Sequence, residues 1–536
     1  MKVAIIGAGP SGLASIKSCI EENFEPVCFE RENSIGGLWN FTEDERHSSV
    51  YRATAINTSK EMSCFSDFPV PERFSVFMSH NEVMEYLHLY SSHFDLFKYI
   101  TLNTTVIAIT KAEDYSLSGK WQVKYHTQGL DVITMIFDAV MVCTGHLWYP
   151  SLPSFPGLKI FEGRQLHSHS FKDTHGFENK KVLVVGFGNS AADIATELSH
   201  QASQVYLSTR RGGWVISRLS SRGLPWDLYQ ERRIYQIFPT KLMESLFMDM
   251  ANGRFDHENF GIRPKHGILN SPAVVSDEFP HRVTNGTLKI KPNVSHFTQK
   301  DVVFDDGTTV EDLDAVVFCT GYKIVFNFLS EDVLRTHDNQ VSLFKYIFPP
   351  DLPHSTLSFI GLTQSSGSMF PLIDLQTRLV MQVISGKCHL PSRDAMVKDI
   401  QEKRREMENK FINSKRCTIQ VSSIAYKDEI ADMIGCKPAL WKLLLTDPFL
   451  ALLCIFGPCT PSQYRLNGPG SWSGAKRAIK HAYANAYPKT GWLARKERFS
   501  LYRMVKKIGG VIIAMTRSFL TEAVTKIGGA LYSFFL

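Results

Sequence analysis

The sequence lacks the paired cysteines that disulfide-bonded folds and zinc sites need. Its ten cysteines are scattered along 536 residues, and no two of them form a C-x-x-C pair. This absence excludes a small disulfide-stabilised scaffold and argues against a structural zinc site. We expect reduced cysteines, in a protein that works in a reducing compartment.

Long uncharged hydrophobic runs are also missing. The apolar stretch 505–536 is interrupted by Arg517, Glu522 and Lys526, whereas a membrane-spanning helix needs about 18–20 consecutive apolar residues. The apolar segment at the N-terminus is short and is already a strand of the fold. We therefore expect neither a clean transmembrane span in this stretch nor a signal peptide.

Excess positive charge is concentrated in one region. The formal net charge is +6, and residues 471–510 hold ten Lys or Arg against a single acid, Glu497. Behind this cationic segment, apolar side chains recur at helical spacing at Ile508, Ile512, Met515, Phe519, Ala523, Ile527, Leu531 and Phe534. We expect an amphipathic helix lying on a membrane surface, with packing of the stripe on the protein itself as the alternative. No nucleic-acid-binding module accompanies the charge, so no nucleic-acid partner is expected.

Two glycine-rich turns stand directly after short apolar strands. The first turn follows residues 3–6 and consists of Gly7, Ala8, Gly9, Pro10, Ser11 and Gly12. The second follows residues 182–185 and consists of Gly186, Phe187, Gly188, Asn189, Ser190 and Ala191. A strand, a glycine turn and a helix start form the dinucleotide-binding fingerprint, because glycines let the backbone approach a pyrophosphate and the helix N-terminus supplies N–H donors. Alanine in place of the third glycine is a known substitution.

The residues expected to contact the ribose carry opposite charges in the two units. About 20 residues after each turn a second strand should end in such a residue. This residue is Glu30 in the first unit and Arg210 in the second. A carboxylate accepts hydrogen bonds from free ribose hydroxyls, whereas an arginine pairs with a 2′-phosphate. The first site is therefore suited to FAD and the second to NADPH.

Two further strands share one pattern. Residues 137–143 and 313–319 are apolar, and each is followed by Thr-Gly and a ring side chain. This internal repeat predicts that each strand closes one nucleotide-binding unit. We therefore predict an α/β fold with two Rossmann-like dinucleotide-binding domains, the NADPH domain being inserted in the FAD domain.

The predicted domain boundaries follow from this repeat. They are 1–154 for the first part of the FAD domain, 155–330 for the NADPH domain, 331–445 for completion of the FAD domain, 446–504 for an apolar and basic region, and 505–536 for the membrane-associating tail. The stretch of about 212–280 is too long for a loop and predicts a largely helical insertion. Residues 392–412 predict a charged, solvated helix. The apolar stretch 440–456 is broken by Lys442, Asp447 and Pro448, so it predicts a buried or membrane-facing helix pair.

Several motifs resemble one enzyme family. Residues 161–171 fit the pattern F-x-G-x-x-x-H-x-x-x-(Y/F) of flavin-dependent N- and S-oxygenating enzymes, and they lie between the two glycine turns. Residues 35–39, 56–69, 254–261 and 456–459 also resemble the vertebrate flavin-containing monooxygenases, the microsomal, dimethylaniline N-oxide-forming type. The resemblance covers nearly the whole chain.

The resemblance implies a set of cofactor contacts. FAD is expected at Gly7, Ala8, Gly9, Pro10, Ser11, Gly12, Glu30, Leu38, Trp39, Asn57 and Thr58. NADP is expected at Ile56, Asn57, Ser190, Ala191, Ala192, Asp193 and Arg210. Asn57 is the expected catalytic residue, because an amide both donates and accepts hydrogen bonds and stays neutral across physiological pH. The alternative is that Asn57 is an ordinary turn asparagine.

The resemblance also implies the reaction. NADPH reduces the flavin, O2 forms a C4a-hydroperoxyflavin, and a soft amine nitrogen or sulfide sulfur of a small xenobiotic or metabolite takes its terminal oxygen. Two alternatives stay open: Baeyer–Villiger oxygenation of ketones, and a largely uncoupled NADPH oxidase that produces H2O2. A disulfide reductase is disfavoured, since residues 31–63 contain no cysteine.

The family further implies a cellular setting. We expect attachment to the endoplasmic reticulum membrane, with the catalytic body facing the cytosol. The expected partners are the small-molecule amine or sulfide substrate, O2 and the membrane surface. The oligomeric state is open, with a homo-oligomer as one alternative.

Overall fold

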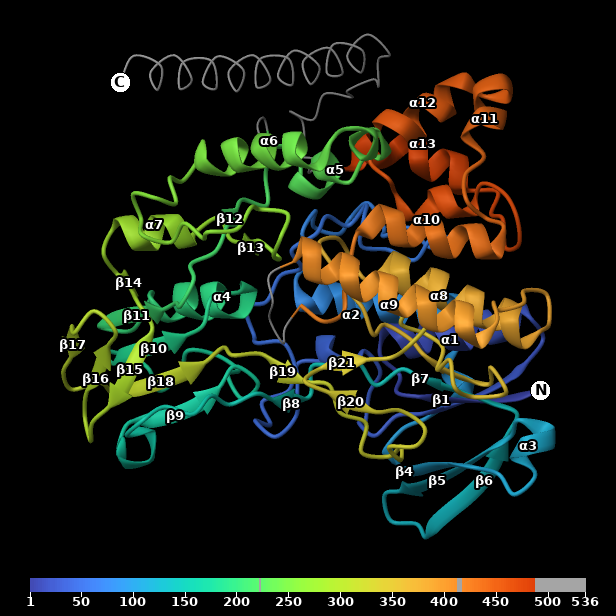
Figure 1. Cartoon of the computed structure of the whole chain (residues 1–536), viewed down its shortest axis with the longest axis horizontal. Coiled ribbons are helices and arrows are strands. Elements are labelled where there is room, and N and C mark those ends of the chain that lie inside the picture. The colour runs from blue at the N-terminus through green and yellow to red at the C-terminus, as the bar shows by residue number, and fades with distance from the viewer. Residues whose placement is uncertain (221–222, 412–416, 487–536) are drawn as a thin grey trace.

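The computed structural model describes residues 1–220, 223–411 and 417–486 (Figure 1). The predicted tail 505–536 and most of the cationic segment lie outside the described residues. All ten cysteines lie inside them, and each is a free thiol. Among the described helices, none has both the length and the hydropathy to cross a bilayer.

A five-stranded parallel sheet forms the core of the first unit. Its strand order is β22-β7-β1-β2-β3, and every neighbouring pair is parallel. The strands are β1 (Lys2–Ile6), β2 (Glu25–Phe29), β3 (Ile100–Thr101), β7 (Ala139–Val142) and β22 (Leu357–Phe359). Strands buried on both faces need continuous apolar sequence, and this explains the apolar runs of β1 and β7. The helices α1 (Pro10–Glu21) and α8 (Phe370–Ile384) pack against each other beside this sheet.

A second parallel sheet repeats the arrangement. Its order is β14-β11-β10-β18-β9, again with parallel neighbours. The strands are β9 (Arg164–His167), β10 (Lys181–Val185), β11 (Gln204–Ser208), β14 (Leu288–Lys291) and β18 (Ala315–Phe318). All of them fall between β7 and β22 in sequence, and the two sheets lie side by side (Figure 1). The mixed α/β fold with parallel Rossmann-like sheets is confirmed.

Each unit also contains an antiparallel meander that the sequence patterns did not predict. In the first unit it consists of β4 (Thr104–Lys111), β5 (Trp121–Thr127) and β6 (Val132–Phe137). In the second it consists of β15 (Val294–Phe297), β16 (Val302–Phe304) and β17 (Thr309–Val310). Each meander directly precedes β7 or β18, the two strands whose shared pattern indicated the repeat.

The insertion between β11 and β14 is less helical than predicted. In its described residues the helices are α5 (Trp226–Gln230), η5 (Arg233–Ile237), α6 (Thr240–Asn252) and α7 (Phe279–Thr284), with short strands β12 (Val215–Ile216) and β13 (Val274–Val275). Residues 253–273 contain neither helix nor strand. The reason is local, because Pro225, Pro239, Gly253 and Pro264 interrupt helical hydrogen bonding or favour turns. A separate apolar cluster that includes Trp214, Tyr235 and Phe247 holds the insertion together.

Further helices and two-stranded pairs complete the described part of the chain. They are α2 (His80–His93), α3 (Tyr115–Ser118), α4 (Asn189–Leu198), α10 (Ser423–Ile434), α13 (Ala475–Asn485), η1 (Gly37–Trp39), η2 (Phe97–Tyr99), η3 (Leu158–Ile160) and η6 (Pro461–Arg465), and the pairs β8 (Tyr149–Pro150) with β19 (Tyr322–Lys323), β20 (Thr336–His337) with β21 (Gln340–Val341), and β23 (Gln364–Ser365) with β24 (Gln420–Val421).

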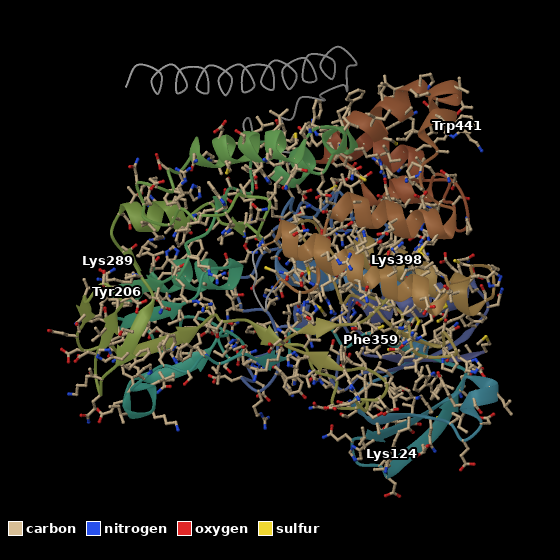
Figure 2. The ribbon with its side chains drawn as sticks, viewed as in Figure 1. Lys124, Tyr206, Lys289, Phe359, Lys398 and Trp441 are labelled. Carbon is tan, nitrogen blue, oxygen red and sulfur yellow. The ribbon has the colours of Figure 1, made fainter. Side chains whose placement is uncertain are left out.

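Both helical predictions for the C-terminal third are confirmed. The charged helix is α9 (Arg393–Lys410), in which only Met396 is buried. The apolar stretch forms the pair α11 (Leu440–Thr446) and α12 (Pro448–Phe456). Four side chains of α12 are buried and none of α11; Trp441 on α11 is 65% exposed and lies at the outer edge of the molecule (Figure 2).

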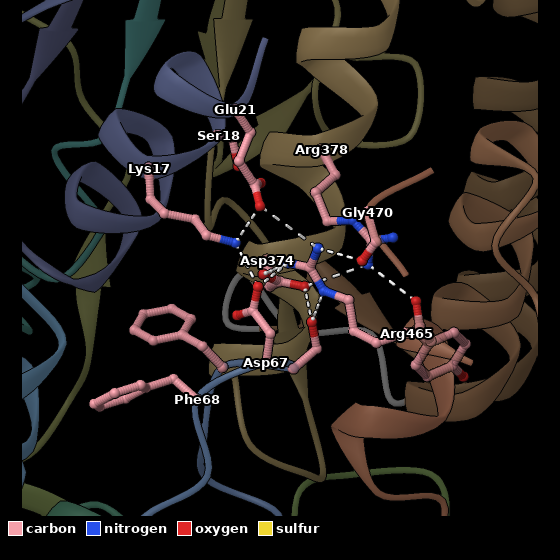
Figure 3. A network of polar contacts seen from close by, with 12 residues as sticks. Lys17, Ser18, Glu21, Asp67, Phe68, Asp374, Arg378, Arg465 and Gly470 are labelled. Atoms are coloured by element: carbon pink, nitrogen blue, oxygen red, sulfur yellow. Dashed lines mark hydrogen bonds and ion pairs between the residues drawn. The ribbon is translucent and has the colours of Figure 1, made fainter. Parts of the chain in front are cut away.

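A buried ion network joins the C-terminal region to the first unit (Figure 3). Arg465 is only 1% exposed; its guanidinium donates to Ser66 Oγ at 2.6 Å and lies 3.1 Å from Asp374 Oδ1 on α8. It also lies 3.0 Å from Asp67 Oδ2, which pairs with Lys17 on α1 at 2.5 Å. Removing one partner from such a network leaves a buried charge uncompensated. The network therefore fixes η6 against α1 and α8.

Candidate functional site

A cavity of about 1280 Å³ opens at the carboxyl ends of β1 and β2 and extends to Asn189, at the start of α4, and to the insertion. In parallel α/β sheets this edge is where ligands bind. Ten of the residues expected at the cofactors line it: Gly7, Gly9, Pro10, Ser11, Glu30, Leu38, Trp39, Ile56, Asn57 and Thr58. The structure thus brings together most of the residues assigned to FAD, although they come from distant parts of the chain.

The first glycine turn has the geometry of a phosphate cradle. Gly7 has φ +101°, and a Cβ on Gly12 would lie 1.9 Å from the Gly7 carbonyl oxygen. A Cβ on Gly9 would lie 3.6 Å from Gly37 Cα, so the two glycines let these segments approach closely. Helix α1 begins at Pro10, within this turn, so its first N–H groups have no helical acceptor. The turn therefore fits a bound pyrophosphate.

Glu30 stands at the end of β2 beside this turn. Its Oε2 accepts a hydrogen bond from the backbone N–H of Ala8 at 2.6 Å, and its Oε1 accepts one from Glu32 N at 2.9 Å. The residue is 6% exposed, and burial raises the pKa of its carboxyl group despite the two N–H donors that favour the charged form. Each carboxylate oxygen has further acceptor capacity, so the position fits ribose hydroxyls. Ala8 contributes its backbone to this contact.

Asn57 is held by an arginine from the insertion. Arg218 Nη2 donates to Asn57 Oδ1 at 2.8 Å, and both residues line the cavity. The next residue, Thr58, shares a hydrogen bond of 2.6 Å with Ser63 Oγ. Sequence reasoning missed Arg218, because its distance from Asn57 along the chain leaves no pattern that links the two.

The second glycine turn resembles the first in its backbone. Gly186 has φ +123°, and a Cβ there would lie 2.5 Å from the Cys319 carbonyl oxygen. Asn189 at the start of α4 lines the cavity, and its Oδ1 accepts from Val275 N at 2.8 Å. The sequence patterns did not assign Asn189 a role.

The other residues expected at NADP lie outside the cavity lining. Ser190 and Arg210 are exposed, Ala191 and Ala192 are fully buried, and Asp193 is half-buried, with a pKa that burial raises to about 6. The two alanine side chains pack in the core of the second unit. Ala191 and Ala192 could therefore contact a phosphate only through their backbone N–H groups. The assignment of these residues to NADP stays a prediction.

The histidine of the linker motif has a structural environment. His167 ends β9 and is buried, and its Nδ1 accepts from His169 N at 3.1 Å. Its ring lies 5.2 Å from the Tyr322 ring in an edge contact. Burial lowers its pKa to about 4, so the ring is neutral at physiological pH.

The insertion supplies lining residues that sequence reasoning did not identify. They include Ile216, Arg218, Trp226, Asp227, Gln230, Glu231, Phe247, Ile268 and Leu269. Asp227 is tied to the segment after Asn57, since its Oδ2 accepts from Ser59 N at 2.7 Å and Ser59 Oγ at 2.8 Å.

Comparisons with known proteins agree with this geometry. A family model described as Flavin-binding monooxygenase-like matches residues 1–514. The chain is 45% identical over 486 residues to Flavin-containing monooxygenase 5 of Rattus norvegicus, covering 89% of this chain and 91% of that protein. It is 46% identical, with the same coverage, to Dimethylaniline monooxygenase (N-oxide-forming) 2 of Mus musculus.

Solved structures show the same fold. The S-allyl-L-cysteine S-oxygenase from Allium sativum superposes with a TM-score of 0.64 at 25% identity, covering 90% of this chain and 98% of that chain. A cyclohexanone monooxygenase superposes with a TM-score of 0.59 at 15% identity, covering 84% and 98%; this likeness concerns the fold alone. The resemblance seen in the motifs is confirmed: the chain belongs to the flavin-containing monooxygenases, flavin-dependent enzymes that use FAD and NADPH.

Proposed function

We propose that this enzyme transfers one oxygen atom from O2 to a soft nitrogen or sulfur of small molecules in the cavity beside Asn57. The observation that carries the proposal is the continuity of the cavity, which joins the Gly7–Gly12 turn and Glu30 to Asn57 and to the insertion. The relatives named for N-oxide formation and S-oxygenation support this substrate class. The cyclohexanone monooxygenase likeness gives no reason to favour ketones, since it shows the fold alone.

Different residues of the cavity bind FAD and position the reacting groups. The turn at 7–12 and Glu30 hold FAD, with Leu38 and Trp39 nearer its flavin end and Thr58 beside Asn57. Bound FAD takes a hydride from NADPH and activates O2 for transfer to the substrate. Asn57, oriented by Arg218, provides fixed donor and acceptor groups near the flavin, and the aromatic walls of the insertion limit access of water.

NADPH is proposed at the second turn. The N-terminus of α4, with Ser190, Ala191, Ala192 and Asp193, would hold its pyrophosphate, and Arg210 after β11 would pair with the 2′-phosphate. Ile56 and Asn57 would approach its nicotinamide end. The parallel order of the second sheet supports this division, because its central strand precedes the turn as β1 does in the first unit.

The experiment that tests the function is a coupling measurement. The purified full chain with FAD is mixed with NADPH, O2 and either dimethylaniline or a thioether, and NADPH consumed is compared with oxide and H2O2 formed. We expect oxide to match most of the NADPH consumed. If H2O2 accounts for all NADPH with every amine and sulfide, the protein is an oxidase and the proposal is wrong.

We also propose attachment to the endoplasmic reticulum membrane with the catalytic body in the cytosol. The relatives' family and the cationic, amphipathic C-terminal sequence support it. Deletion of residues 505–536, which lie outside the described residues, should move the protein from the membrane fraction to the supernatant while FAD stays bound. Unchanged membrane association would show that this tail is not the main anchor.

A further inference from the structure

A loop of the first unit lies along the cofactor cavity and contacts the second unit. Residues 42–50 contain neither helix nor strand. Glu30 and Glu32, directly after β2, line the cavity. The same cavity is lined by these members of the loop: Thr42, Asp44, His47, Ser48 and Val50. The 42–50 loop therefore stands beside the position that fits the ribose of FAD.

Contacts with the first unit hold one side of this loop. Ser48 Oγ donates to Leu147 O at 2.6 Å, in the segment after β7. The His47 ring brings its Nε2 to 3.7 Å from Glu32 Oε1. Glu32 N in turn donates to Glu30 Oε1 at 2.9 Å. A short chain of contacts thus connects the loop to the carboxylate expected at the ribose.

A lysine of the second unit holds the other side of the loop. Lys172 directly follows the linker motif at 161–171, and its Nζ donates to His47 O at 2.7 Å and to Ser49 Oγ at 2.8 Å. Just beyond the loop, Arg52 N donates to Lys172 O at 2.8 Å. Lys172 therefore holds this segment with both its side chain and its backbone.

Two ion pairs between the same segments are weaker. Arg164 Nη2 lies 3.3 Å from Glu45 Oε1. Arg52 Nε lies 3.5 Å from Asp173 Oδ2. All four side chains are more than a third exposed, and exposed ion pairs contribute little because water and salt screen them. Lys172 is only 7% exposed, and hydrogen bonds from a charged donor are stronger. Lys172 therefore supplies most of the attachment of the loop to the second unit.

The charges of the loop complement this lysine. Burial lowers the pKa of Lys172, whereas the carboxylates of Asp44 and Glu45 on the loop act in the opposite direction and favour its charged form. An apolar replacement of Lys172 therefore removes a charge attraction to the loop as well as two hydrogen bonds.

We propose that Lys172 is a positioning residue that retains FAD by holding the 42–50 loop against the cavity. Lys172 is not among the described residues that line the cavity, so it acts through His47 and Ser49 and not by contact with FAD. The residue that follows the linker motif of the second unit thus controls how fast FAD leaves the first unit. This role does not depend on which substrate the enzyme oxygenates.

The test follows FAD as it leaves the purified full chain, without NADPH or substrate. Lys172→Met keeps the length of the side chain but removes its donors. We expect the rate of FAD dissociation, measured as the rise of flavin fluorescence after dilution, to increase about tenfold, the size expected for the loss of charge-assisted hydrogen bonds. Lys180→Met removes an exposed lysine paired with Asp314 on the second unit, and as the matched control it should keep the wild-type rate. An unchanged rate in Lys172→Met overturns the proposal.

Limited proteolysis reports on the loop itself. Arg46 is a trypsin site within the loop, and its side chain is 85% exposed. Without FAD, Lys172→Met should be cut after Arg46 several times faster than the wild type, because the loop is no longer held. Cuts elsewhere should proceed at the wild-type rate. Faster cleavage at every site would show a general loss of structure and would overturn the specific role of Lys172.

A double-mutant cycle tests the route from Lys172 through the loop. Ser49→Ala removes one of the two acceptors of Lys172 Nζ and should raise the rate of FAD dissociation about threefold. In the Lys172→Met background the same substitution should have no further effect, because the bond is already lost. Equal effects of Ser49→Ala in the two backgrounds, zero included, overturn this route. None of these measurements involves turnover, so they decide the role of Lys172 even if the proposed oxygenation fails.

Discussion

Arg218 Nη2 donates a hydrogen bond of 2.8 Å to Asn57 Oδ1 and thereby fixes the amide that we expect beside the flavin. The arginine comes from the insertion in the second unit, whereas Asn57 belongs to the first. The bond thus couples the cofactor region to the element that closes the cavity. Misplacement of a group near the reacting centre by about 1 Å can cost a large part of the rate.

The first prediction concerns this bond. Arg218→Met should free the Asn57 amide to rotate and should raise the H2O2 formed per NADPH consumed several-fold, while FAD stays bound. A charged hydrogen bond contributes about 1.5–3 kcal/mol, so oxide formation should fall roughly tenfold or more. The measurement is the ratio of H2O2 to oxide. Arg263→Met, which removes an exposed arginine of the same insertion, is the control. Equal coupling in the two variants would contradict the role of Arg218.

The second prediction concerns Glu30. Glu30→Gln keeps the size of the side chain but places an amide N–H₂ against one of the two backbone N–H donors, Ala8 or Glu32. We expect FAD to bind about ten- to a hundredfold more weakly, from the loss of a charge-assisted bond and the clash of donors. Flavin absorbance after gel filtration measures the retained cofactor. Glu25→Gln, on the exposed end of the same strand, should retain FAD as the wild type does.

The third prediction concerns Arg210. Because only NADPH carries the 2′-phosphate, Arg210→Ala should raise KM for NADPH about tenfold or more and leave KM for NADH nearly unchanged. Steady-state oxidation of both nucleotides measures the two constants. Lys289→Ala removes an exposed cation from the neighbouring strand, where Lys289 pairs in register with Tyr206. An equal effect of Arg210→Ala on both nucleotides would remove the reason for placing the phosphate there.

The fourth prediction concerns the buried network around Arg465. Arg465→Met leaves Asp374 and Asp67 short of positive charge, and breaking such a pair costs about 3–5 kcal/mol. We expect a clearly lower apparent Tm and partial loss of FAD, since the network holds α1 in place. Arg393→Met breaks an exposed pair with Asp351 and should change stability by less than about 1 kcal/mol.

The fifth prediction is the pH dependence of this network. Burial disfavours ionisation of Asp374, but the charges of Arg465, Arg378 and Lys17 outweigh burial and lower its pKa. A carboxylate whose pKa is lower in the folded state stabilises the fold above its unfolded pKa, about 3.9, and this stability is lost as the pH falls further. The wild-type apparent Tm should therefore fall more steeply below about pH 4 than that of Asp374→Asn. Parallel curves would contradict the shift.

Local sequence was sufficient to predict the two glycine turns and the strands that precede them. It also placed a carboxylate, Glu30, and a guanidinium, Arg210, after the second strand of each unit. Glycine at φ +101° in Gly7 and at φ +123° in Gly186 is a backbone requirement that only glycine meets without strain. The helix pair of α11 and α12 also followed from local breaks in an apolar stretch. Such features depend on neighbours along the chain, and a single sequence displays them directly.

The insertion could not be predicted in the same way. Its length suggested a largely helical segment, yet prolines and glycines between 225 and 264 left α6, of 13 residues, and shorter helices among the described residues. Its fold depends on packing of Trp214, Tyr235 and Phe247 in one cluster, and no periodic pattern encodes that packing. The meander before β7 was missed because its strands are mixed in polarity, and the one before β18 because its strands have only 4, 3 and 2 residues.

The sequence alone determined the two glycine turns and their parallel-sheet units, and it predicted a cofactor for each, because glycine turns and strand-end charges act through the local backbone. Only the tertiary structure decided which side chains share the cavity. Arg218 reaches Asn57, and Lys427 reaches Glu231, across long stretches of chain. Such pairs form because the packing of separate elements brings them together, and the free energy of that packing is spread over the whole core.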